Sequence, residues 1–199
     1  MRLHLDIPER RPERDGRGNQ EAAPYSGRMP FTPVHMGPGL LLKALMRGAF
    51  SLIIFGYAQV LIDLQPAVAL ATGRGAVHGW SHTWVGAVAI GAFAAVTGRP
   101  LTNAALRLVR GATRSGLRVS WAVALGSAFI GTLSHVAIDS LIYPDMHALR
   151  PWSDAQPWLG AATSAEVYGG CFLSGAMGAV LYLGLAWRRS RRSEVTRSR

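Results

Sequence analysis

Cysteine, lysine and acidic residues are all scarce in this chain of 199 residues. The single cysteine, Cys171, excludes an internal disulfide, and with it a disulfide-stapled secreted scaffold and a cysteine-based zinc finger. Charged residues make up 16% of the chain, against about 25% in an average soluble domain. Five of the eleven acidic residues lie in the first 21 residues, so the middle of the chain contains few acidic residues. A globular protein with this composition would be poorly soluble in water.

The basic residues are almost all arginines, and the formal net charge is +10. They gather in two tails and in one loop, 98–118, beside apolar runs. This distribution is typical of membrane proteins, in which arginines set orientation or contact anionic lipids. We therefore expect a lipid bilayer as partner and no nucleic acid.

The composition divides the chain into three parts. Residues 1–28 are polar and lack apolar periodicity, which predicts a disordered tail. No apolar run follows the early arginines, so this tail is not a cleavable signal peptide. The composition changes at Met29, and translation from Met1 or from Met29 both remain open. We expect a membrane-embedded helical domain over 29–187 and a basic cytoplasmic tail over 188–199.

Four apolar stretches occupy the middle of the chain, at residues 37–71, 80–97, 119–143 and 165–187. The last three approach the ~20 residues that a spanning helix needs. Glycines are frequent in them, and such small residues let helix backbones approach closely in lipid. The pattern predicts an all-α, polytopic membrane helical bundle.

The first stretch is compound, and two geometries are open for it. Two short antiparallel helices, 36–46 and 49–64, turning at Arg47-Gly48 form a re-entrant or short hairpin beside three spanning helices. A single span over 48–71 is the alternative, and it leaves His35 on the opposite side. We favour the hairpin because cations are easier to place at an interfacial turn than in mid-bilayer.

The distribution of arginines predicts which face of the bundle is cytoplasmic. On the hairpin model the loops 65–79 and 143–164 share one face and carry only Arg74 and Arg150. The other face carries eleven arginines, in loop 98–118 and the C-terminal tail. This basic face should be cytoplasmic in a bacterial inner (plasma) membrane.

Histidines and aspartates gather near the sparsely charged face. They are His35, Asp63, His78, His82, His135 and Asp139, followed by Asp145 and His147. His78/His82, at an expected helix start, and His135/Asp139 are each four residues apart, which puts each pair on one side of a helix. An ionisable group left unpaired at membrane depth costs several kcal/mol. Imidazole and carboxylate together suit Zn²⁺ or another transition metal, whereas Mg²⁺ or Ca²⁺ would need more oxygens.

Each of these features also has a purely structural explanation. The pair His78/His82 can cap a helix, and a His135/Asp139 couple can lock two helices together. Asp63 can pair with Arg74.

Four motifs occur in order along the chain: TPVHMGPG, VLIDLQP, HGWSHT and GTLSHVAIDSLIYPDMHALRPW. Over about residues 29–152 the chain resembles the LexA-binding, inner-membrane-associated hydrolases (YdjM-like membrane-bound metal-dependent hydrolases). The resemblance places the family's motif residues on His35, Asp63, His78, His82, His135 and Asp139. It implies an all-helical fold, distantly similar to zinc-dependent phospholipase C and single-strand nucleases, and phosphodiester or phospholipid substrates.

The chain departs from the family pattern at two places. The acidic element reads LIDLQP, so its neighbouring Asp and His are absent, and Gly79 stands where the family has an arginine. These departures leave the number of metal ions open, and they favour one ion or a loss of catalysis.

The leading hypothesis is a membrane-bound metal-dependent hydrolase near the periplasmic face, acting on a phosphate ester or lipid-linked substrate. The metal, expected to be Zn²⁺, would be held by His78, His82, His135 and Asp139, with Asp63 and His35 as further ligands or orienting groups. Asp63 or Asp145 would take a proton from water as the catalytic base. Arg74 or Arg150 would meet a phosphate.

Non-enzymatic alternatives remain. The chain could be an ion- or proton-coupled transporter, or a partner-binding protein with a degenerate metal site. Haem ligation by His82 and His135 is a further alternative. The oligomeric state is open.

Overall fold

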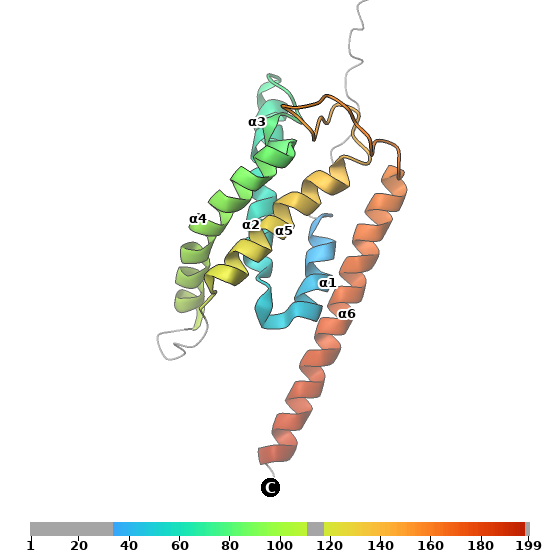
Figure 1. The fold of residues 1–199 in the computed structure, drawn as a ribbon. Coiled ribbons are helices and arrows are strands. Elements are labelled where there is room, and N and C mark those ends of the chain that lie inside the picture. The colour runs from blue at the N-terminus through green and yellow to red at the C-terminus, as the bar shows by residue number, and fades with distance from the viewer. Residues whose placement is uncertain (1–33, 111–117, 198–199) are drawn as a thin grey trace, which may run out of the picture.

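The computed structural model describes residues 34–110 and 118–197, and the regular elements there are all helical (Figure 1). In chain order they are α1 (Met36–Met46), η1 (Arg47–Ala49), α2 (Leu52–Ile62), α3 (Leu64–Thr72), η2 (Trp80–His82), α4 (Trp84–Arg110), α5 (Trp121–Asp139) and α6 (Ser164–Arg197). The predicted tail 1–28 lies outside the described residues.

Four helical segments are long and apolar enough to cross a membrane: Leu52–Thr72, Trp84–Leu108, Trp121–Asp139 and Ser164–Arg191. Large apolar side chains cover their outer surfaces. On α6, Phe172 is 76% exposed and Val180 is 73% exposed. Apolar surface this extensive indicates a lipid environment. The predicted all-α membrane bundle is confirmed.

The hairpin predicted for the first apolar stretch is present. In Figure 1 α1 descends, the chain turns at η1, and α2 runs back up beside it. Arg47 at the turn adopts a positive φ of 53°, and the Lys43 ammonium donates to the carbonyls of Arg47 and Phe50 at 2.6 and 2.7 Å. One detail differs: the second arm does not end at 64, because α3 follows α2 directly and extends the arm to Thr72. The hairpin therefore includes a segment long enough to cross a membrane, close in its bounds to the alternative span over 48–71. Four segments rather than three have that length.

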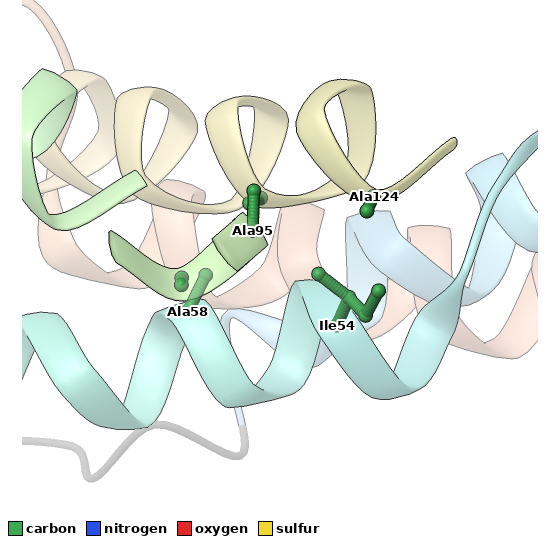
Figure 2. Close-up of a cluster of buried hydrophobic side chains, with 6 residues drawn as sticks. Ile54, Ala58, Ala95 and Ala124 are labelled. Atoms are coloured by element: carbon green, nitrogen blue, oxygen red, sulfur yellow. The ribbon is translucent and has the colours of Figure 1, made fainter. Parts of the chain in front are cut away.

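Small side chains bring α2, α4 and α5 together (Figure 2). Ile54 and Ala58 of α2 pack against Ala95 of α4 and Ala124 of α5, and all four are fully buried. The alanines permit close approach of the helix backbones, which is how membrane helices commonly pack.

The last helix, α6, packs mainly on α1. A Cβ on Gly37 would lie 1.9 Å from the Cys171 carbonyl oxygen, and one on Gly178 would lie 2.4 Å from the Leu41 nitrogen. Glycine is therefore required at both contacts. α6 begins with a capping box, in which Thr163 and Glu166 exchange hydrogen bonds between side chain and backbone.

Two helices are longer than the apolar stretches that predicted them. α4 was expected to end near residue 97 but continues through Pro100 to Arg110. Its last turns are tied to the start of α5, because Arg99 Nε donates to the Val119 carbonyl and Asn103 Oδ1 accepts from the Val119 N–H. α6 continues across the expected boundary at residue 187 to Arg197.

The fold gives the bundle two distinct ends. The start of α1, the α2–α3 junction, η2 and the end of α5 lie in the upper part of Figure 1, which we call the upper end. The η1 turn and the end of α6 lie at the opposite, lower end.

Candidate metal centre

Six side chains from four segments converge at the upper end. They are His35 before α1, Asp63 between α2 and α3, His78 and His82 around η2, and His135 and Asp139 in the last turn of α5. The four histidines and Asp139 are buried, and Asp63 is partly buried. Residues separated by as many as 104 positions thus share one polar interior.

Asp139 lies among three imidazoles. Its Oδ1 is 3.3 Å from His35 Nε2, and its Oδ2 is 3.6 Å from His82 Nε2 and 3.1 Å from His135 Nε2. The carboxylate therefore presents both oxygens to the histidines.

Asp63 faces two of the same imidazoles. Its Oδ1 lies 3.7 Å from His82 Nε2 and 3.1 Å from His135 Nε2. For comparison, four ligands at ~2.1 Å from a tetrahedral zinc ion lie about 3.4 Å from one another. The nitrogen-to-oxygen separations in the cluster match this spacing.

Three overlapping groups of three residues have ligand atoms close enough to hold an ion, with every pair of ligand atoms in a group within 4.8 Å. The groups are His35–His135–Asp139, Asp63–His82–His135 and His78–His82–Asp139. Three residues each belong to two groups, so the six side chains form a single connected donor set.

Several ligand atoms in this cluster are buried and have no hydrogen-bond partner within the described residues. They are the Nε2 atoms of His35, His78 and His82 and the Oδ1 atom of Asp139. A buried polar atom without a partner is costly. A cation held by one of the three groups gives a partner to the ligand atoms of that group, so the residues present could hold a metal ion.

Three of the imidazoles are fixed from behind through Nδ1. His135 Nδ1 donates to Gln59 Oε1, His78 Nδ1 donates to the Asp145 carboxylate at 2.9 Å, and His82 Nδ1 is hydrogen-bonded to the Ser81 hydroxyl at 2.9 Å. Such partners select the tautomer and turn Nε2 towards the centre, as they do around metal-bound histidines.

Gln59 and Ser81 were not predicted as site residues. Gln59 is fully buried and lies four residues before Asp63 on α2, which is the signal that could have revealed it. Ser81 directly precedes His82, and its backbone N–H donates to Gln65 Oε1 at 3.0 Å. A Cβ on Gly79 would collide with this Gln65 side chain. The glycine that departs from the family pattern thus leaves room for a contact that fixes the η2 turn.

The expected helix start at His78 and His82 is not observed. His78 lies in a turn, His82 ends the η2 turn, and α4 begins only at Trp84. Their rings are nonetheless adjacent, with centroids 5.0 Å apart. The chain brings the two imidazoles together by turn geometry rather than by helical periodicity.

The cluster lies in apolar surroundings. Ile62, Ala87, Val136 and Met146 form a buried group at the upper end. Burial lowers the pKa of His82, more than the opposing contact with Asp63 raises it. The imidazole therefore favours its neutral form, which is the form that binds a metal.

The remaining predicted residues lie outside the cluster. Asp145 reaches it only through His78. Arg74 is exposed. His147 and Arg150 both contact Asp154, the arginine at 2.5 Å, and both line a cavity beside His78.

This cavity has a volume of about 360 Å³. Trp80, Thr83 and Val85 form its apolar side, and His78 belongs both to the cavity and to the cluster. His78 therefore joins the wall of the cavity to the candidate metal centre.

The spacing of His82 and His135 does not suit haem. Their ring centroids are 5.2 Å apart, and both Nε2 atoms face the same Asp63 oxygen. No space for a macrocycle separates them.

Comparisons with known proteins add no relative: no family model matches the chain, and no curated protein or solved structure matches it either.

Proposed function

We propose that this chain is a membrane-bound metal-dependent hydrolase of the YdjM-like kind, and that it cleaves a phosphate ester or a lipid-linked substrate. One observation carries the proposal. The buried Nε2 atoms of His35 and His82 face the carboxylate of Asp139 at 3.3 and 3.6 Å, and within the described residues these atoms and His78 Nε2 make no hydrogen bond. Such an arrangement is costly unless a cation occupies it.

In the proposed centre Asp139 holds the ion together with His78 and His82, or together with His35 and His135, and the remaining side chains orient the donor set. A bound Zn²⁺ ion acts as a Lewis acid and lowers the pKa of coordinated water towards ~7. The apolar surroundings strengthen the electrostatic interactions in the site.

Asp63 is the carboxylate best placed to take a proton from water. It is 19% exposed, whereas Asp139 is 4% exposed. Asp63 is therefore the more accessible of the two carboxylates to water. We assign Asp145 a positioning role instead, because its carboxylate fixes the His78 imidazole.

The substrate class follows from the cavity beside His78. Arg150 and His147 offer nitrogen donors for a phosphate, and Trp80 and Val85 offer apolar surface for an attached chain. The neighbouring helices are apolar enough to lie in a membrane. These features support a phosphate ester carried on a lipid.

Ion transport is less well supported than hydrolysis. The fully buried Ile54, Ala58 and Ala95 fill the bundle between α2, α4 and α5, towards the lower end from the cluster (Figure 2). A transport path would need a continuous line of polar groups along this region, and these three side chains are apolar.

Turnover by the full chain in detergent micelles tests the proposal. After chelation and titration with Zn²⁺, we expect hydrolysis of bis-p-nitrophenyl phosphate or of a phospholipid to return with the metal. Asp63→Asn should lower kcat by about 10²–10⁴-fold, the usual range for a lost general base.

Glu166→Gln is the matched control, because Glu166 is an exposed carboxylate outside the cluster and the cavity, and glutamine keeps an oxygen that accepts the capping hydrogen bond of α6. It should leave kcat unchanged. A protein that binds Zn²⁺ but hydrolyses neither class of substrate would contradict the hydrolase proposal and leave the metal centre as a binding site.

A further inference from the structure

A second cavity lies at the lower end of the bundle, where the η1 turn meets α6. Its volume is about 380 Å³. Lys43, Arg47 and Arg189 line it together with Ala44, Tyr182 and Leu185. Among the lining residues that the structure describes there are three cations and no carboxylate. The cavity lining therefore combines cations with apolar side chains.

The cations have spare hydrogen-bonding capacity. Lys43 uses two of its three N–H donors on the carbonyls of Arg47 and Phe50. Within the described part of the chain, neither Arg47 nor Arg189 forms an ion pair. Three positive groups without a counter-charge repel one another unless an anion joins them.

The cavity also lies at the depth of a lipid headgroup. From Ser164, where α6 begins at the upper end, to Leu185 is a rise of ~32 Å, close to the ~30 Å thickness of a bilayer core. Two arginines at this end stack on tryptophan rings, Arg99 on Trp121 at 4.4 Å and Arg191 on Trp187 at 4.6 Å. Tryptophan and arginine are both common at the boundary between membrane and water.

We propose that this lower cavity binds the anionic phosphodiester headgroup of a phospholipid. The cations hold the phosphate, while Tyr182 and Leu185 contact the glycerol backbone and the first carbons of the acyl chains. Basic pockets between membrane helices recognise anionic lipids in this way. A soluble phosphate ester would pair with the cations equally well but would not contact the apolar side chains of the cavity, so we assign the site to the lipid.

This lipid site is separate from the proposed hydrolytic centre, since no lining residue is shared between the two cavities. It is positioned to hold the α1–α2 turn against α6. The lipid would thereby stabilise the hairpin that carries His35, without taking part in hydrolysis.

Native mass spectrometry of the full chain in detergent tests the site. The probe is an equimolar mixture of phosphatidylglycerol and phosphatidylcholine with identical acyl chains. The wild-type protein should retain phosphatidylglycerol in preference. In the double variant Arg47→Gly/Arg189→Gln this preference should fall about 25-fold, since each arginine contributes about fivefold. Glycine suits position 47 because the backbone there has a positive φ.

The matched control is Arg188→Gln/Arg191→Gln, which removes the same charge from α6 outside the cavity. It should keep the wild-type preference. Equal losses in both double variants, or no loss in the cavity variant, would overturn the proposal. Displacement of the lipid by an equal concentration of soluble glycerol phosphate would also overturn it, because the occupant would then be a soluble anion.

If the double variant fails to fold, a single variant still tests the site. Arg189→Gln alone changes an exposed side chain of α6 and should cost about fivefold in preference. Helical circular dichroism and the thermal midpoint should stay at the wild-type values. An unchanged preference in this folded single variant would overturn the assignment.

Discussion

Asp139 and Gln59 act on the same imidazole from opposite sides. Asp139 Oδ2 lies 3.1 Å from His135 Nε2, and Gln59 Oε1 accepts from His135 Nδ1. The glutamine thereby fixes the ring, and the aspartate shares its inner face. Gln59 is thus a positioning residue for the proposed metal ligand, as outer partners of histidine ligands commonly are.

Replacing Gln59 with leucine should weaken zinc binding about 10–100-fold, because the His135 ring loses the acceptor that orients it. Competition with a fluorescent zinc chelator measures the affinity. Gln59→Glu keeps an acceptor oxygen and should bind zinc within a few-fold of wild type. If the leucine variant bound as tightly as the glutamate variant, His135 would not be a ligand.

Asp145 gives a pH dependence of stability. Burial alone would raise the pKa of its carboxyl, but the hydrogen bond from His78 outweighs it, and the net pKa is below the ordinary 3.8. The folded state therefore binds fewer protons than the unfolded state near this pH. The stabilisation is present at neutral pH and is lost as pH falls through the lowered pKa.

We expect wild type to have a higher thermal midpoint than Asp145→Asn at neutral pH, and the difference to close as pH falls below about 4. Thermal unfolding in detergent across this pH range measures both proteins. A difference that stays constant with pH would show that the carboxylate charge does not contribute.

At the scale of elements, the position of His35 depends on how α1 packs on α6. The contact at Gly37 leaves no room for a side chain, since its Cβ would lie 1.9 Å from a backbone oxygen of α6. A backbone oxygen cannot move aside without shifting the helix. α1 would then have to move, and His35 would move with it.

The substitution Gly37→Ala should therefore destabilise the protein by about 1–3 kcal/mol, the usual cost of overpacking, and weaken zinc binding. Gly184→Ala is the matched control on α6, because nothing lies within 4 Å of its Cβ position. Thermal unfolding and zinc competition measure the two variants side by side. Equal stability of the two would show that the α1–α6 contact is not close-packed in the protein.

The helices were largely predictable from the sequence, because the length of each apolar stretch and the turn residues at its ends directly indicate a membrane helix. The hairpin turn followed from the cations at Lys43 and Arg47. The extension of α4 was not predictable in this way, because Pro100 commonly marks a helix end and the contacts of Arg99 and Asn103 with Val119 form only in the folded chain.

The candidate site was predictable only in part. The paired spacing of His135 and Asp139 pointed to polar residues on one helix face, and the hairpin brought His35 to the same end. Gln59 had the same four-residue spacing to Asp63, but glutamine and serine are common on helices and turns, so neither Gln59 nor Ser81 was singled out. Their roles depend on distances between segments that sequence spacing does not encode.

At the scale of the whole molecule, charge distribution predicts orientation. Arg188, Arg189 and Arg191 lie on α6 towards the lower end, and the candidate metal centre lies at the upper end. Since arginine-rich ends of membrane helices stay in the cytoplasm, we propose that the metal centre faces the periplasm. The native Cys171 is buried, so introduced cysteines can report on each end.

Labelling of intact cells with a membrane-impermeant maleimide tests this orientation. Arg74→Cys should react from outside, and Arg197→Cys should react only after the membrane is permeabilised. The wild-type chain should remain unlabelled in both conditions. Labelling of Arg197→Cys in intact cells would reverse the proposed orientation.

The central claim, that buried imidazoles and carboxylates hold a cation, is tested most directly by metal content. Inductively coupled plasma mass spectrometry on the full chain, extracted in mild detergent without added metal, counts ions per chain. We predict at least about one zinc-class ion in wild type and in Glu166→Gln, and less than about a tenth of that in Asp139→Asn, because Asp139 faces three of the histidines. A folded, monodisperse wild-type protein with no more metal than Asp139→Asn would contradict the account.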